Sequence, residues 1–206
     1  MSSRLTKKEW EYGIKYLTEV DNVLGDIIQK FPKSKIQFKN NAFKTLTQSI
    51  VGQQISIKAA ASIWSRLETL LDGQITQQNI IHIKETKLKK IGLSRQKISY
   101  LKDLSNSNIE STSWNTLTDE EVINEITKIK GIGIWTAQMF LIFHLGRKNV
   151  LPLADIGLLN AIEKNYNIPA RTNLKSIEKI SNRWIPWQTI ATWYLWKSID
   201  TVDVEY

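Results

Sequence analysis

Residues 126–140 read ITKIKGIGIWTAQMF, and this stretch is the most informative part of the chain. Its apolar residues up to Ile129 predict the end of one helix, the KGIG segment predicts a tight turn, and a second helix is expected from Ile134. This order predicts a helix-hairpin-helix motif, which we place at residues 118–145. A Gly-X-Gly turn can also be the cap of one helix followed by the start of another, so that alternative stays open.

The hairpin has the composition of an anion-binding turn. Glycine lets the main chain approach a phosphate closely, and the first amides of the second helix are unpaired donors at the positive end of the helix dipole. The candidates for these phosphate-binding amides are Gly131, Gly133 and Thr136.

The rest of the chain favours helices as well. Its 206 residues include only four prolines and nine glycines, and apolar residues recur at a spacing near 3.6. We therefore predict an all-α protein, with Ser56, Thr118 and Thr172 as helix N-caps. The expected helices cover about 6–17, 20–30, 40–51, 56–71, 76–81, 84–90, 94–104, 118–129, 133–145, 156–166, 173–183 and 187–198.

Composition excludes several kinds of site. There is no cysteine, which rules out disulfides, thiolate zinc sites and iron–sulfur clusters, and there are only two histidines. The net charge of +8 favours a polyanionic partner such as nucleic acid. The N-terminus lacks the apolar run of a signal peptide and no stretch is long enough to span a membrane, so we expect a soluble, intracellular protein without membrane contact.

The charges are unevenly distributed along the chain. Residues 84–102 contain seven basic side chains and one acidic one, whereas residues 103–127 contain six acidic side chains and no basic one. This asymmetry predicts one positive face that could contact phosphates. The alternative is that the lysines are ordinary solvated side chains on helix surfaces.

One carboxylate stands out downstream of the hairpin. Residues 151–158 read LPLADIGL, which places Asp155 at the start of an apolar helix. An aspartate in this position is usually an N-cap. In apolar surroundings it can cap the helix and still face a pocket, so the two roles are compatible.

Four blocks of the sequence together resemble one family. They are residues 42–67 (AFKTLTQSIVGQQISIKAAASIWSRL), 130–147 (KGIGIWTAQMFLIFHLGR), 151–158 (LPLADIGL) and 183–196 (RWIPWQTIATWYLW). In this order they are similar to the helix-hairpin-helix DNA glycosylase superfamily, and within it to the 3-methyladenine DNA glycosylase II family.

The resemblance implies a two-lobed helical glycosylase fold without an additional N-terminal β-rich domain. The lobes would be residues 36–145 and residues 1–35 plus 146–206, in one compact unit with the lesion pocket between them. The protein would act as a monomer on double-stranded DNA that contains alkylated bases, in the cytoplasm and nucleoid or in a nucleus.

The resemblance also implies the chemistry. Asp155 would be the catalytic aspartate, which stabilises an oxocarbenium-like transition state and positions water. Purines alkylated at N3 or N7 already carry positive charge and leave as neutral bases, so a single carboxylate could suffice. Relatives with lyase activity have a lysine where this chain has Trp135, so we predict a monofunctional glycosylase.

Further roles carry over position by position. Trp135, Met139 and Trp196 would line the pocket for the extruded base, although an aromatic residue is frequent at the position of Met139. Gln53 and Gln54 resemble the segment that fills the gap left in the duplex, unless they only bond to local main chain. Ser94, Arg95 and Lys97 would contact the DNA backbone.

No cofactor is required by this chemistry. A structural Na⁺ or K⁺ ion at the hairpin is implied by the resemblance, held by the main-chain carbonyls of Thr127, Ile129 and Ile132. Two other functions stay open: a catalytically silent DNA-damage binding protein, and a glycosylase for mismatched or deaminated bases. The sequence does not rank 3-methyladenine, 7-methylguanine, 1-methyladenine, ethenoadenine and hypoxanthine as substrates.

Overall fold

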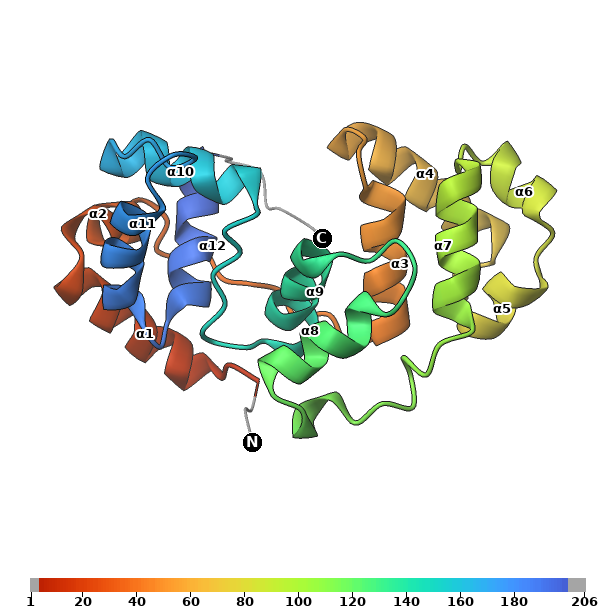
Figure 1. Ribbon diagram of the computed structural model, residues 1–206, viewed down its shortest axis with the longest axis horizontal. Helices are drawn as coiled ribbons and strands as arrows, with labels where there is room; N and C mark the ends of the chain where they lie inside the picture. The colour runs from red at the N-terminus through yellow and green to blue at the C-terminus, as the bar shows by residue number, and fades with distance from the viewer. Residues whose placement is uncertain (1–3, 200–206) are drawn as a thin grey trace. The chain divides into compact units, whose positions relative to one another are not determined.

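The computed structural model describes residues 4–199, and of Ile57 only the main chain. Within this range the chain forms α-helices and no strand, which confirms the all-α prediction (Figure 1). No helix in these residues has both the length and the apolar character needed to cross a bilayer. The α-helices are α1 (Lys7–Val20), α2 (Asn22–Lys30), α3 (Ala42–Gly52), α4 (Ile57–Leu70), α5 (Gln77–His82), α6 (Glu85–Lys90), α7 (Arg95–Ser105), α8 (Asp119–Thr127), α9 (Ile134–Phe140), α10 (Ile156–Tyr166), α11 (Leu174–Ser181) and α12 (Gln188–Ile199).

The described chain divides into two compact units, one of residues Lys39–Phe140 and the other of residues 4–38 and 141–199. The first unit therefore contains α3 to α9, and the second contains α1, α2 and α10 to α12. These boundaries fall at Lys39 and Phe140, where the sequence suggested residues 36 and 145.

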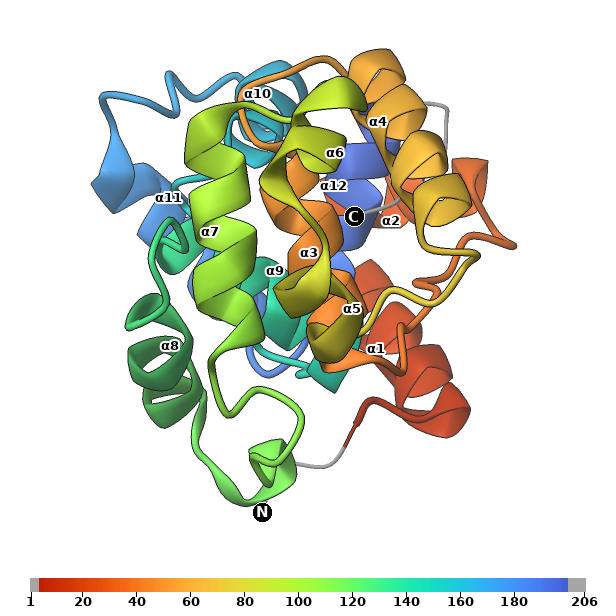
Figure 2. The ribbon, with the colours of Figure 1, turned by 90° about the vertical axis from the view of Figure 1, so that its right-hand side faces the viewer.

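Helix α3 organises the first unit. It packs against α4, α7 and α9, while α7 also contacts α5 and α6, and α8 contacts α9 (Figure 2). Its buried apolar residues Phe43, Leu46, Ile50 and Val51 follow helical spacing, so an apolar stripe of the helix faces the core. The hairpin between α8 and α9 belongs to this unit.

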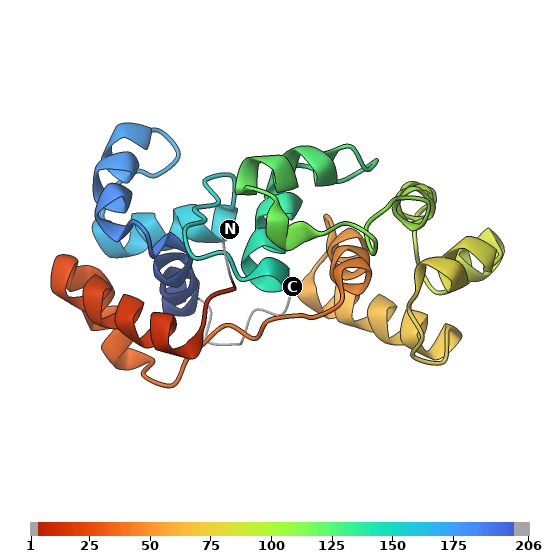
Figure 3. The ribbon, with the colours of Figure 1, turned by 90° about the horizontal axis from the view of Figure 1, so that it is seen from below.

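Helix α12 has the corresponding role in the second unit. It packs against α1, α2 and α10, and α1 lies beside it in Figure 3. Every residue from Thr189 to Lys197 is buried, as expected for a helix that is enclosed by others. The segment that leads toward Asp155 is attached to its first turn, because the Thr189 hydroxyl donates to the Arg147 carbonyl at 2.6 Å.

The second helix of the hairpin motif differs from the prediction. The sequence indicated one α-helix over residues 133–145, but α9 ends at Phe140 and Leu141–Leu145 forms a turn of π-helix. Gly146 then ends the helical segment with a φ of +64°, and the Arg147 amide bonds back to the Leu141 carbonyl at 2.9 Å. This is the closure by a left-handed glycine that commonly terminates helices.

Two of the three predicted N-caps are confirmed. The side chains of Ser56 and Thr118 accept hydrogen bonds from the amides of Ala59 and Glu121. The third prediction is wrong by one residue, because Asn173 caps α11 in place of Thr172. Either side chain can cap, so only the backbone geometry decides between neighbours.

Candidate functional site

Asp155 is the N-cap of α10, and the residue is only 6% exposed. Its Oδ1 accepts a hydrogen bond from the Leu158 amide at 2.6 Å. The next residue, Ile156, is 64% exposed, so the carboxylate lies just beneath the surface of its unit. The positive end of the helix dipole stabilises negative charge at this place.

Trp196 of α12 holds the same oxygen. Its indole Nε1 donates to Asp155 Oδ1 at 2.8 Å, and its ring lies almost parallel to that of Phe143, with 6.0 Å between the centroids. Gly157 makes room for this contact, because a Cβ there would lie 3.1 Å from Asp155 Oδ1. The packing of α10 on α12 thus brings together two predicted residues, Asp155 and Trp196.

Trp135 and Met139 lie in the other unit, on successive turns of α9. The Trp135 side chain is half-buried, whereas Met139 is 1% exposed and belongs to the core of its unit. Both side chains come from the helix that follows the hairpin, as the sequence indicated.

The hairpin has the geometry expected of a turn whose main chain can closely approach a ligand such as a phosphate. Gly131 has a φ of +83°, and a Cβ there would clash with the Tyr100 ring. A Cβ at Gly133 would meet no atom of the described chain within 4 Å apart from its chain neighbours, so the main chain is open to a ligand there. Thr136 is buried within the first turn of α9, whose leading amides are not paired inside the helix.

Gln53 and Gln54 have different surroundings. The Gln53 side chain donates from Nε2 to the Gly131 carbonyl at 2.9 Å, which is a contact with the hairpin and not with local main chain. Gln54 is exposed, with a left-handed φ of +56° that is uncommon for a residue other than glycine. Of the two, Gln54 is the side chain that projects outward.

The three residues at the start of α7 that were predicted to contact the DNA backbone also differ in their surroundings. Ser94 caps α7 by accepting from the Lys97 amide at 3.2 Å, and Arg95 is exposed. The Lys97 ammonium instead donates to the Val51 carbonyl at 2.7 Å, and burial lowers its pKa. Lys97 therefore binds the end of α3, a partner that the sequence did not suggest.

The basic segment 84–102 contains a second half-buried lysine whose ammonium binds carbonyls. Lys102 donates to three carbonyls at the end of α5, those of Ile80, Ile81 and Ile83, at 2.6, 2.7 and 2.9 Å. Burial lowers the pKa of Lys102, and the nearby Glu85 carboxylate opposes this shift. The exposed basic side chains of the segment are Lys84, Lys87, Lys89, Lys90 and Arg95.

The three carbonyls suggested for a monovalent cation surround the hairpin turn. That of Ile129 accepts from the Ile132 amide at 3.1 Å, which still leaves one of its two lone pairs. In the described part of the chain no three His, Asp or Glu side chains gather as metal ligands, so any ion here would depend on main-chain oxygen. Such oxygens suit hard cations.

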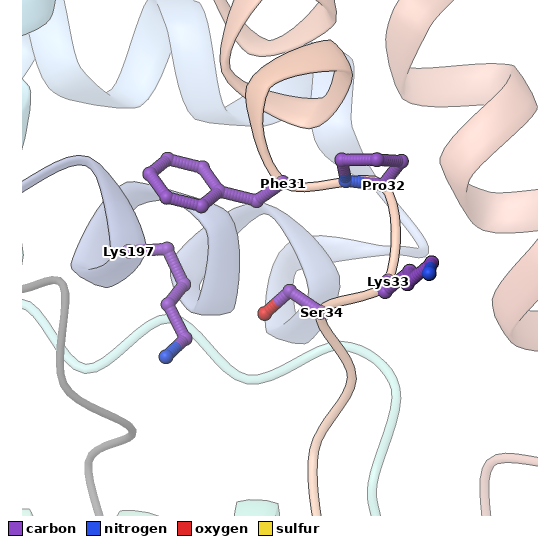
Figure 4. Close-up of a pocket in the computed structure, with 5 residues that line it drawn as sticks. All are labelled: Phe31, Pro32, Lys33, Ser34 and Lys197. Carbon is purple, nitrogen blue, oxygen red and sulfur yellow. The ribbon is translucent and has the colours of Figure 1, made fainter.

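A pocket of about 300 Å³ lies elsewhere on the second unit, lined by Phe31, Pro32, Lys33, Ser34 and Lys197 (Figure 4). It does not include Asp155. Ser34 attaches this segment to α12, since its hydroxyl accepts from Trp193 Nε1 at 2.9 Å. The pocket is therefore a surface feature beside the helix that carries Trp196.

Sequence reasoning missed several residues around these sites, namely Tyr100, Asp103, Phe143 and Gly157. Tyr100 and Asp103 contact the hairpin, and Phe143 and Gly157 adjoin the pair of Asp155 and Trp196. Their roles depend on tertiary contacts, which spacing along the chain does not reveal. The glycine that follows Ile156 was the one available signal, because a glycine early in a helix indicates close packing.

The chain is similar to named DNA glycosylases and to solved structures of such enzymes. The DNA-3-methyladenine glycosylase 1 of Schizosaccharomyces pombe is 29% identical over 184 residues, which cover 86% of this chain and 81% of the relative. The crystal structure of a DNA-3-methyladenine glycosidase from Bacillus halodurans superposes with a TM-score of 0.76 at 32% identity, over 90% of this chain and 88% of the other. The S. pombe 3-methyladenine DNA glycosylase in complex with abasic DNA gives a TM-score of 0.79 at 28% identity, over 91% and 96%.

A family model identifies the family of this chain. It matches residues 47–186, a range that includes the hairpin, Asp155 and most of the described helices. The chain belongs to the HhH-GPD superfamily of base excision DNA repair proteins.

Proposed function

We propose that this protein is a monofunctional DNA glycosylase that extrudes alkylated, cationic purines such as 3-methyladenine from duplex DNA and hydrolyses their N-glycosidic bond. The observation that carries the proposal is the buried carboxylate of Asp155, which is capped by a helix and bonded to Trp196 Nε1 at 2.8 Å. Relatives named as 3-methyladenine glycosylases support the substrate class.

The chemistry requires one carboxylate near the sugar. As the bond from C1′ to the base nitrogen breaks, its electron pair stays on the base, and a cationic purine leaves as a neutral molecule. Positive charge then develops on the sugar, where the Asp155 carboxylate stabilises it and orients the attacking water. Water adds to C1′, its proton is lost, and an abasic site remains.

One feature supports a reaction without strand cleavage. Position 135, on the first turn of α9, is a tryptophan and has no amine that could form a Schiff base with the sugar. We assign the half-buried Trp135 to the binding of the extruded base, and stacking on aromatic rings is worth roughly 1–3 kcal/mol per base.

The remaining parts bind DNA and hold the hairpin. We assign the amides at Gly131, Gly133 and Thr136, the exposed Gln54, Ser94 and Arg95 to the DNA contacts. A Na⁺ or K⁺ ion, held by the carbonyls of Thr127, Ile129 and Ile132, would supply positive charge at the hairpin, and no cofactor takes part in the hydrolysis. The protein would act as a monomer inside the cell, where its DNA substrate is.

The experiment is base release from methylated duplex DNA, identified by mass spectrometry and run beside Asp155→Asn. We expect the wild-type protein to release methylated purines and Asp155→Asn to release none while it still binds DNA. Asp26→Asn, at an exposed aspartate of α2, is the matched control and should keep full activity. Strands should break only after alkali treatment, because a glycosylase without lyase activity leaves the backbone intact.

Two results would contradict the proposal. Absence of base release from the wild-type protein would favour a silent damage-binding protein. Release of mismatched or deaminated bases in preference to methylated ones would show a different substrate class.

A further inference from the structure

The hairpin turn is closed by its own main chain. The Ile132 amide donates to the Ile129 carbonyl at 3.1 Å, and Gly131 lies at the third position of this turn with a φ of +83°. A type II turn requires that conformation at that position. The Tyr100 ring packs where a Cβ of residue 131 would be, so the turn rests directly on α7.

The same turn is held from two sides by side chains that come from outside it. Asp103 of α7 accepts a hydrogen bond from the Lys130 amide to its Oδ2 at 2.7 Å. Gln53, which follows α3, donates from Nε2 to the Gly131 carbonyl at 2.9 Å. Adjacent residues of the hairpin are therefore bound to α7 and to the segment that follows α3.

The segment after α3 is itself fixed at its base. Lys97 donates to the Val51 carbonyl at 2.7 Å, near the negative end of the α3 dipole. Gln53 follows two residues later, and Gln54 then adopts its left-handed conformation with the side chain exposed. The Val51 carbonyl and the Gln53 side chain, which flank residue 52, are thus both bound to the protein, whereas the Gln54 side chain is exposed.

We infer that Gln53 is a positioning residue. Its bond to the hairpin holds the turn that carries Gln54 in place, so that Gln54 and the hairpin act on DNA as one preformed surface. The inference rests on the proposed function and deepens it, because it separates the roles of two neighbouring glutamines. The Gln53 amide already bonds to the hairpin, so it is the connection between the two loops. Gln54 is the side chain that enters the duplex.

This arrangement has a measurable consequence. Hairpin amides bind phosphates whether or not a base is damaged, whereas a residue that fills the gap of an extruded nucleotide favours damaged DNA. Loss of the bond from Gln53 to Gly131 should therefore reduce the preference for damaged DNA more than the affinity for DNA in general. Preorganisation of this kind lowers the cost of ordering the loop when it binds.

The test is a double-mutant cycle on DNA affinity. We measure binding to a duplex with an abasic-site analogue and to the undamaged duplex, for Gln53→Leu, Gln54→Ala and the double variant. Each single variant should lower the ratio of the two affinities about tenfold, the effect of one hydrogen bond. The double variant should be no worse than Gln54→Ala, because residues that act through one another are not additive.

The controls separate positioning from folding. Gln53→Glu keeps the shape of the side chain but cannot donate when ionised, so it should reproduce Gln53→Leu even if the leucine variant folds poorly. Gln78→Leu, at an exposed glutamine of α5, makes the same replacement away from the hairpin and should leave the ratio unchanged.

Three outcomes would overturn the inference. The ratio could stay constant in Gln53→Leu and Gln53→Glu, or both affinities could fall equally, or the effects at positions 53 and 54 could add. All of these are read from binding alone, so they are independent of whether the wild-type protein releases methylated bases.

Discussion

The hydrogen bond from Trp196 to Asp155 gives the tryptophan a role beyond stacking on a base. The indole nitrogen lies 2.8 Å from Oδ1, and the Leu158 amide binds the same oxygen at 2.6 Å. Two donors on one oxygen fix the orientation of the carboxylate. An oriented charge stabilises a cationic transition state without rearranging as the reaction proceeds.

We predict that Trp196→Phe slows base excision under single-turnover conditions by about 10- to 100-fold, because hydrogen bonds to charged groups are worth about 1.5–3 kcal/mol. The affinity for duplex DNA with an abasic-site analogue should change little. Trp193→Phe is the matched control on the same helix, since its indole donates to Ser34 and not to the carboxylate. Equal losses of activity in the two variants would assign the effect to packing of α12.

The sequence predicted the role of a residue better when the group that this residue binds lies nearby in the chain. Asp155 is the cap of the helix that follows it, a local relation that its position already indicated. Gln53 and Lys97 were predicted to contact DNA, yet they bind carbonyls 78 and 46 residues away in the sequence. A polar side chain has the same appearance in a sequence whether its partner is a phosphate or a distant carbonyl.

The helix that enters the hairpin depends on a capping box. In α8 the Thr118 side chain accepts from the Glu121 amide at 3.2 Å, and the Glu121 carboxylate accepts from the Thr118 amide at 2.7 Å. The bond from the Thr118 amide, and secondly one that the Thr118 hydroxyl donates to the same carboxylate at 2.9 Å, lower the pKa of Glu121 below its ordinary value of 4.5. The hairpin follows directly after α8, so fraying of this helix would reach the phosphate-binding turn.

We predict that the capping charge stabilises the protein above the ordinary carboxyl pKa and that this contribution is lost as the pH falls through the lowered pKa of the folded state. Thermal unfolding of the wild-type protein and Glu121→Gln, followed between about pH 6 and about pH 3, should show a difference that shrinks as the pH falls. Glu120→Gln removes a neighbouring charge from the same turn but no capping bond. If it showed the same pH dependence, the dipole and not the box would be the cause.

Helix positions were predictable because their signals are local. The apolar spacing and the capping side chains of α4 and α8 lie within the helices themselves. The π-helical turn at Leu141–Leu145 was not predicted, since a change from one helical hydrogen-bond register to another leaves the apolar pattern almost unaltered. It nevertheless matters for the site, because Phe143 of this turn stacks on Trp196.

The fold separates the basic residues that contribute to the net charge of +8 by the groups they contact. The sequence suggested that the seven basic residues of segment 84–102 form one phosphate-binding face. Two of them, Lys97 and Lys102, instead bind carbonyls at the ends of α3 and α5. Half-buried lysines of this kind have their ammonium groups bound at helix ends, so they are less available to phosphates.

The salt dependence of DNA affinity should distinguish the exposed lysines from those bound to carbonyls. We predict that the double variant Lys89→Gln with Lys90→Gln reduces the slope of log affinity against log salt for undamaged duplex DNA by up to about 2, because each phosphate contact contributes close to one unit. Its thermal stability should stay unchanged, since both side chains are exposed.

Lys102→Met should lower the stability and leave the salt dependence of DNA binding unchanged. The salt slope should remain that of the wild-type protein, whereas the free energy of unfolding should fall by about 1–3 kcal/mol, because three carbonyls lose their shared donor. That loss corresponds to a lower Tm by about 2–4 °C per kcal/mol for a chain of this size. A reduced salt slope in Lys102→Met would mean that its ammonium leaves the end of α5 to bind a phosphate. An unchanged slope in the Lys89 and Lys90 double variant would place the DNA on another face of the first unit.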